Sequence, residues 1–224
     1  MKSDLQIQRD ILAELEWEPY LNPAEIGVAV KDGVVTLSGK VDSFSKKIAL
    51  EKAVKRIAGV RALAEDVEVG ISPELEKTDS EIAQIVLNAL KWNTTIPDER
   101  IYVKVEDGIV KLEGETDWDF QRGSAQSVVE HLSGVRSVIN LITIKTGLAV
   151  ANIHEQITSA FERHARIDSG KIDVQVDGNK VILSGKVRSW AEKEDAETAA
   201  WLAPGVEAIE NQLEVEMPSY AFNI

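Results

Sequence analysis

The chain has 224 residues, of which 44% are hydrophobic and 28% are charged, a composition typical of folded soluble proteins and unlike that of disordered ones. Its formal net charge of −13 excludes nucleic acid as a general partner, because the phosphates would be repelled. The absence of cysteine excludes disulfides, thiolate catalysis and cysteine-ligated metal sites.

No stretch of the sequence approaches 18 consecutive apolar residues, so we expect a protein that is not integral to a membrane. Asp4, Arg9, Asp10 and Glu14 interrupt the N-terminal region before an apolar run of signal-peptide length can form. If residue 1 is the native start, this predicts a cytoplasmic protein; if a leader was removed, it predicts a periplasmic one.

The chain contains an internal repeat. Three segments begin at Val30, Val105 and Val176, and each reaches a glycine nine residues later, at Gly39, Gly114 and Gly185. Twenty residues further on, each copy has a Gly-Val pair, whose glycines are Gly59, Gly134 and Gly205. Identical spacing in all three copies predicts three versions of one structural unit.

Each copy begins with apolar residues spaced four apart, which predicts a helix with one buried side: Ile7/Ile11/Leu15, Ile82/Val86/Leu90 and Ile153/Ile157/Phe161. Alternating apolar residues then predict a strand: Ile26/Val28/Val30, Ile101/Val103/Val105 and Ile172/Val174/Val176. An Asp-Gly pair follows and predicts a hairpin turn into a second strand.

Helical spacing returns after the first glycine of each copy: Leu50/Ala53/Val54/Ile57, Ala125/Val128/Val129/Leu132 and Ala196/Ala199/Ala200/Ala203. The glycine of the Gly-Val pair is expected at the left-handed C′ position that ends this helix. A last alternating strand carries Val67/Val69, Ile142/Ile144 and Leu213/Val215. All six glycines are therefore interpreted as structural.

These elements predict an α+β protein of three tandem αββαβ modules, each with two helices on one face of a three-stranded mixed sheet. The expected modules span residues 1–70, 76–146 and 148–217. The links fall near residues 71–77 and 146–147.

The Asp-Gly-x-Val-x-Leu-x-Gly hairpin and the closing Gly-Val pair resemble the BON domain of osmotic-stress periplasmic and nodulation-associated bacterial proteins, and the resemblance covers nearly the whole chain. It implies the same fold and a non-enzymatic role in envelope integrity and stress. It also implies binding to phospholipid surfaces and, in one branch, to potassium ions.

A search for catalytic motifs favours the interpretation that the protein is not an enzyme and has no cofactor. Gly33 to Gly39-Lys40 departs from a phosphate-binding loop in spacing, and Val41 replaces the required Ser or Thr. The three histidines, at His131, His154 and His164, occupy unrelated repeat positions without zinc-site spacing, so we expect no metal.

The second helix of the first copy is the candidate contact surface. Residues 1–70 carry ten Lys and Arg against twelve Asp and Glu, whereas residues 147–224 carry seven against thirteen. The basic residues of the helix are Lys46, Lys47, Lys52, Lys55 and Arg56, preceded by Phe44. One interpretation is contact with anionic lipid; the other is a solvated face whose last-turn cations suit the helix dipole.

Tryptophans form the other candidate surface. Trp118 and Trp190 flank the start of the second helix in copies two and three, where they either close the core or contact a partner. Trp17 and Trp92 end the first helix at equivalent positions, and we expect them at the core edge or between modules.

Two functions follow from these observations. The first is a stress-associated protein that binds anionic phospholipid or envelope components through several modules. The second is a cytoplasmic potassium-responsive or protein–protein interaction scaffold whose modules rearrange on binding.

Overall fold

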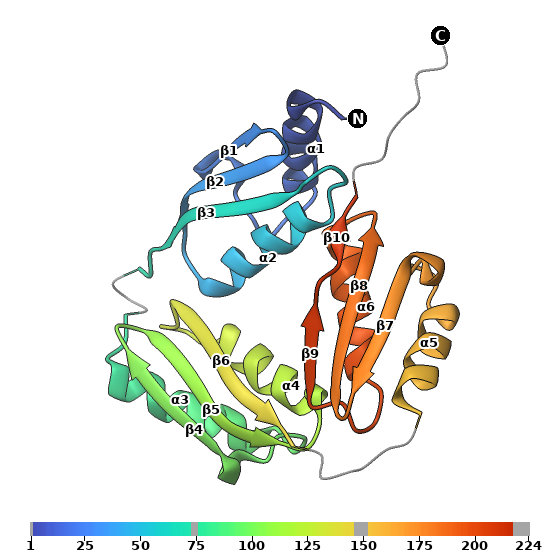
Figure 1. Ribbon diagram of the computed structural model, residues 1–224. Helices are drawn as coiled ribbons and strands as arrows, with labels where there is room; N and C mark the ends of the chain where they lie inside the picture. Colours follow the sequence, from blue (N-terminus) through green and yellow to red (C-terminus); the bar gives the residue numbers. More distant parts are fainter. Residues whose placement is uncertain (1, 73–75, 146–151, 217–224) are drawn as a thin grey trace.

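The computed structural model describes residues 2–72, 76–145 and 152–216, which form three modules (Figure 1). We call them module 1 (residues 2–72), module 2 (76–145) and module 3 (152–216). The core of the first expected link, 73–75, and the second link at 146–147 lie outside the described residues.

Each module contains the predicted order of helix, strand, strand, helix and strand. Module 1 comprises α1 (Asp4–Glu16), β1 (Ile26–Lys31), β2 (Val34–Val41), α2 (Phe44–Lys55) and β3 (Ala62–Val69). Module 2 comprises α3 (Asp79–Trp92), β4 (Ile101–Glu106), β5 (Ile109–Thr116), α4 (Asp119–Glu130) and β6 (Ser137–Ile144). Module 3 comprises α5 (Ile153–Arg163), β7 (Ile172–Asp177), β8 (Lys180–Val187), α6 (Trp190–Trp201), β9 (Ala208–Asn211) and β10 (Glu214–Val215). A short 3₁₀ turn precedes the first strand of each module, at Pro23–Glu25, Asp98–Arg100 and Ser169–Lys171.

The sheets are mixed, as the sequence predicts. The middle strand of each sheet, β2, β5 or β8, pairs antiparallel with the preceding strand and parallel with the following one. Module 3 differs in that its last strand is divided into β9 and β10, with Gln212 and Leu213 between them. The Gln212 N–H still donates to the Leu183 carbonyl at 2.8 Å, so the chain stays attached to β8 across the break.

The apolar residues spaced four apart on the first helix of each module, here called the stripe residues, lie in the cores. All three stripe residues of each first helix are at most 3% exposed. Leu50, Ala125 and Ala196, on the second helices, are fully buried opposite them. One predicted core position is wrong: Val176, near the end of β7, is 36% exposed.

The first repeated glycine of each module lies on the second strand, where the chain entering the first strand passes close to it. Gly39, Gly114 and Gly185 have φ of +131°, +128° and +122°, which L-residues with a side chain rarely adopt. A Cβ on any of them would lie 2.1 Å from a backbone carbonyl oxygen of the chain that enters the paired strand. Only glycine fits this crossing.

The glycine of the Gly-Val pair has a positive φ but does not occupy the helix C′ position. Helix α2 ends at Lys55 with Arg56 as its C-cap, and one further turn follows before Gly59, at φ +100°. The Ile57 N–H donates to the Val54 carbonyl and the Val60 N–H to the Ile57 carbonyl, which form that turn. Gly59 therefore lies two residues beyond the C′ position, and the prediction of a C′ glycine is wrong.

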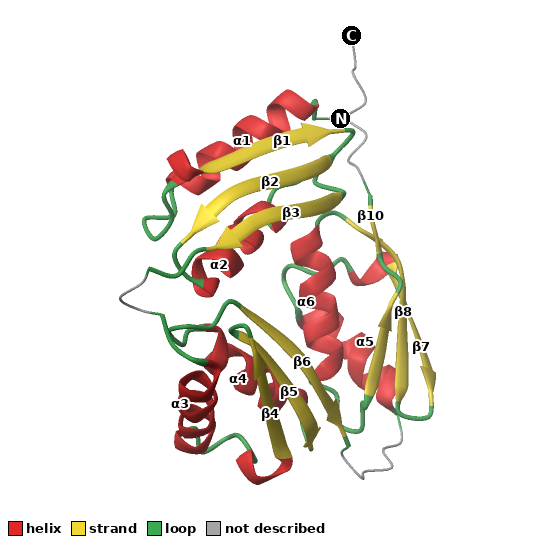
Figure 2. Cartoon of the chain, turned by 90° about the vertical axis from the view of Figure 1, so that its left-hand side faces the viewer, coloured by secondary structure: helices red, strands yellow, loops and turns green. Residues whose placement is uncertain are grey.

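The three second helices, α2, α4 and α6, lie around the middle of the molecule (Figures 1 and 2). Apolar side chains cross between the modules there: Phe44 and Ile48 of α2 pack against the core of module 2. Trp190 of α6 packs against the core of module 1, and Ile144 at the end of β6 joins the core of module 3. The contacts close a triangle of three modules.

Candidate functional site

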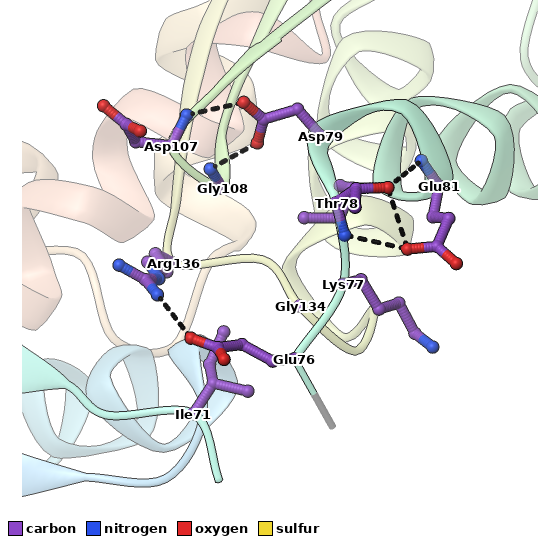
Figure 3. A pocket seen from close by; sticks show the side chains of 11 residues that line it. Ile71, Glu76, Lys77, Thr78, Asp79, Glu81, Asp107, Gly108, Gly134 and Arg136 are labelled. Carbon is purple, nitrogen blue, oxygen red and sulfur yellow. Dashed lines mark hydrogen bonds and ion pairs between the residues drawn. The ribbon is translucent and has the colours of Figure 1, made fainter. Parts of the chain in front are cut away.

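One cleft, of about 480 Å³, lies beside the start of α3 and includes Ile71, next to the gap in the described chain (Figure 3). Its polar groups serve the fold. The Asp79 carboxylate accepts from the Asp107 and Gly108 N–H groups at 3.0 and 2.9 Å, and Glu81 accepts from the Thr78 N–H and hydroxyl. Module 1 repeats the first arrangement, with Asp4 accepting from Asp32 and Gly33. We therefore assign Asp79 and Asp4 to anchoring the hairpin on the helix, and Glu81 to capping the start of α3.

The basic residues predicted on α2 are mostly paired within the chain. Lys46 bonds to Asp42 at 2.6 Å, and Lys47 bonds to the Val67 carbonyl at 3.0 Å. Arg56 pairs with Glu14 and Glu18 of the α1 region. Lys52 is exposed and has no ion-pair or hydrogen-bond partner among the described residues. The cationic surface of α2 is therefore much weaker than its composition suggests.

Lys55 joins two modules. Its ammonium lies 2.6 Å from Glu51 on its own helix and 2.6 Å from Glu194 of α6. Burial alone would lower the pKa of Lys55, but the hydrogen bonds to Glu194 and Glu51 outweigh it and raise the pKa above its ordinary value. Lys55 is thus a positively charged bridge between modules 1 and 3 at neutral pH.

The three aromatic residues predicted to contact a partner have different environments in the structure. Phe44 is 8% exposed and lies in the core of module 2, so it is not part of an exposed surface. Trp190 is half-buried against module 1, with the ammonium groups of Lys55 and Lys193 within 6 Å of its ring. Trp118 is half-buried at the start of α4. Two of the three aromatics thus hold modules together.

Trp17 and Trp92 lie where the sequence reasoning did not place them. They are 84% and 86% exposed, so the expectation of a core-edge or inter-module position is wrong. The spacing already indicated an exposed position. Each tryptophan follows the last buried residue of its helix by two positions, which places it about 200° around the helix, on the side opposite the core. Leu12 and Leu87, also equivalent to each other, are 38% and 47% exposed on the same helices. Module 3 has Thr158 and Arg163 at these positions.

The described residues contain neither a metal-binding group nor a membrane-spanning helix. No group of three or more His, Asp or Glu side chains among them is arranged to hold a metal ion. None of the helices in the described ranges is long and apolar enough to cross a membrane.

Comparison with known proteins finds one similar in sequence and one with a weak structural likeness. Osmotically-inducible protein Y of Escherichia coli (strain K12) is 27% identical over 146 residues, which cover 63% of this chain and 73% of that protein. CdsD, a structural protein of the type III secretion system of Chlamydia trachomatis, is 15% identical across 94% of this chain and 92% of its own, with a TM-score of 0.27. Its C-terminal domain gives the same identity and TM-score. That score is too low to indicate a shared overall arrangement.

The family model of the BON domain matches the chain three times, over residues 3–70, 78–146 and 149–217. Each match spans one αββαβ module and both of its characteristic glycines. The chain therefore belongs to the BON domain family and carries three copies of the domain.

Proposed function

We propose that this chain is a non-enzymatic binding protein of the osmotic-stress response that attaches to phospholipid surfaces through Trp17 and Trp92. The observation that carries the proposal is the exposure of these two indole rings, 84% and 86%, at the same position of two modules. Large exposed apolar side chains at a repeated position are typical of an interaction surface. The stress role is inferred from the family and from the similarity to osmotically-inducible protein Y.

Tryptophan suits the boundary between water and lipid because its ring is apolar and its N–H is polar. Leu12 and Leu87 add apolar surface to the same helices. The net charge of −13 opposes attraction to anionic headgroups, so we expect ring insertion to contribute more than charge. The proposal applies on either side of the cytoplasmic membrane, since both leaflets contain phospholipid.

Replacing both Trp17 and Trp92 with alanine is expected to weaken sedimentation with phospholipid vesicles about tenfold or more, because two interfacial anchors are lost. The assay compares phosphatidylglycerol with phosphatidylcholine vesicles. Leu202→Ala is the matched control, since Leu202 is an apolar side chain, 70% exposed, at the end of α6. Equal binding by the double variant and the wild type would rule out this attachment.

The basic surface of α2 is a second lipid-contact hypothesis, and the same vesicles test it. Lys52, Lys55 and Arg56 are changed together to Glu. Because Lys55 and Arg56 are already paired with carboxylates, we expect at most a small loss of binding. Loss of phosphatidylglycerol binding alone would instead assign the lipid contact to α2.

An ion-responsive scaffold is the second candidate function, favoured by the placement of Lys55 between Glu51 and Glu194 of different modules. Thermal unfolding in matched potassium and sodium chloride series tests it. Stabilisation by potassium at millimolar concentration, absent with sodium, would support an ion-responsive scaffold. Identical melting in the two salts would argue against it.

A further inference from the structure

A cavity of about 370 Å³ lies where the three modules meet, lined by side chains of α2, α4 and α6. Helix α2 contributes Glu51, Lys52 and Lys55, helix α4 contributes Gly123 and Glu130, and helix α6 contributes Glu194. Its volume falls at the lower end of the range of about 300–1,000 Å³ seen for small-molecule pockets. The position is independent of the outward Trp17 and Trp92.

The three copies differ in chemistry around the cavity. By the repeat spacing, Ile48, Gly123 and Glu194 are equivalent, as are Lys55, Glu130 and Trp201. One repeat position beside the cavity is thus apolar in module 1, a glycine in module 2 and a carboxylate in module 3. The repeated glycines and the buried apolar residues of the helices, by contrast, are shared by all three modules. The three copies therefore form one composite cavity and not three equal sites.

Gly123 leaves room that the fold does not require. It lies inside α4, where glycine is less favourable than alanine. A Cβ at this position would meet no atom within 4 Å, so neither packing nor a close backbone approach calls for glycine. Its effect is to leave the cavity wider.

The charges lining the cavity are incompletely matched. Glu130 is only 8% exposed, and its partner among the described residues is the neutral Gln126 amide, at 2.6 Å. A buried carboxylate without a cation is unfavourable. Lys52 lines the same cavity without forming an ion pair in the described structure, while Lys55 is already shared between Glu51 and Glu194.

We propose that this cavity binds a small zwitterion, with its ammonium group at Glu130 and its carboxylate at Lys52. A single molecule of this class supplies both missing charges without changing the net charge of the cavity. Because the lining comes from all three modules, the bound zwitterion stabilises their closed arrangement by RT ln(1 + [L]/Kd).

L-proline and glycine betaine are the probes, with glycerol and sodium chloride as the neutral and ionic references. Calorimetric titration of the full chain is expected to give saturable binding of at least one zwitterion. Saturation matters because solutes excluded from the protein surface stabilise proteins without occupying a site. Lack of saturable heat with both zwitterions, or equal saturable heat with glycerol, overturns the proposal.

In Gly123→Leu the leucine side chain occupies the cavity and is expected to abolish binding. The protein is expected to stay folded, because leucine favours a helix. Gly123→Ala, which adds one methyl group and removes little volume, is expected to weaken binding less than Gly123→Leu. Lys52→Met is expected to weaken binding about tenfold, whereas Lys46→Met, a change on the same helix outside the lining, leaves it intact. Undiminished binding by Gly123→Leu and Lys52→Met overturns the assignment.

Discussion

Gly114→Ala is expected to destabilise module 2 by about 3–5 kcal/mol, enough to unfold it or leave it marginal. The glycine adopts φ +128°, and the added methyl carbon would lie 2.1 Å from the Arg100 carbonyl oxygen. The obstacle is backbone, so no side-chain rotation relieves it. The strands β4 and β5 would have to separate at the pair Ile101–Gly114.

Hydrogen exchange of the β4 and β5 amides measures the loss of stability of module 2. A single melting curve of a three-module chain does not separate the stability of one module from that of the others. Gly123→Ala is the matched control in the same module. It adds the same methyl group to a helix in open space and is expected to stabilise module 2 by roughly 0.5–1 kcal/mol. Similar protection in the two variants would contradict the steric role of Gly114.

The framework of each module was predictable because it depends on local periodicity. Ile7, Ile11 and Leu15 are spaced for one helix face, and this spacing alone places them in the core, where they are at most 1% exposed. The glycine at position 39 and its two equivalents follow from the same logic, since a turn or crossing that excludes a Cβ recurs in every copy. Repetition made these assignments specific.

The arrangement of the modules was not predictable from the repeat, because it depends on residues that the copies do not share. Phe44 of module 1 and Trp190 of module 3 occupy equivalent positions, yet module 2 has Asp119 at that position. Phe44 and Trp190 pack against neighbouring modules, whereas Asp119 pairs with Arg122, which stacks over Trp201 of module 3. Helical periodicity identifies the inner face of α2 but gives no information about what covers its ends.

The same limit explains the basic surface of α2. Sequence places Lys52, Lys55 and Arg56 on one helix side, which is a statement about spacing. It does not reveal that α1 brings Glu14 to Arg56 or that α6 brings Glu194 to Lys55. Ion pairing between elements is a tertiary property, and here it turns a predicted cationic patch into contacts between α1, α2 and α6.

Glu192→Gln is expected to destabilise module 3 by about 2–3 kcal/mol at pH 7, because a buried and fully bonded carboxylate is lost. Glu192 is 4% exposed at the start of α6. It accepts from the Asp168 and Arg188 N–H groups at 2.8 and 2.7 Å, and from the Arg188 guanidinium at 3.0 and 3.1 Å. A glutamine offers one acceptor oxygen and turns an NH₂ group toward these donors.

The pH dependence distinguishes loss of this charge from a packing defect. Burial alone would raise the pKa of Glu192, but the hydrogen bonds from Arg188 and the backbone N–H groups outweigh it and lower the pKa below its ordinary 4.5. The carboxylate therefore stabilises the folded module above pH 4.5, and that contribution is lost as pH falls through the lowered pKa. The gap between wild type and Glu192→Gln should narrow over this acidic range.

Hydrogen exchange of the β8 and α6 amides between pH 3 and pH 7 measures that gap, with exchange rates corrected for pH. Glu155→Gln is the matched control, since Glu155 is exposed in the first turn of α5 and has no ion-pair or hydrogen-bond partner among the described residues. It should follow the wild type at every pH. A gap for Glu192→Gln that stays constant down to pH 3 would show that shape, and not the ionised carboxylate, ties the start of α6 to the chain before β7.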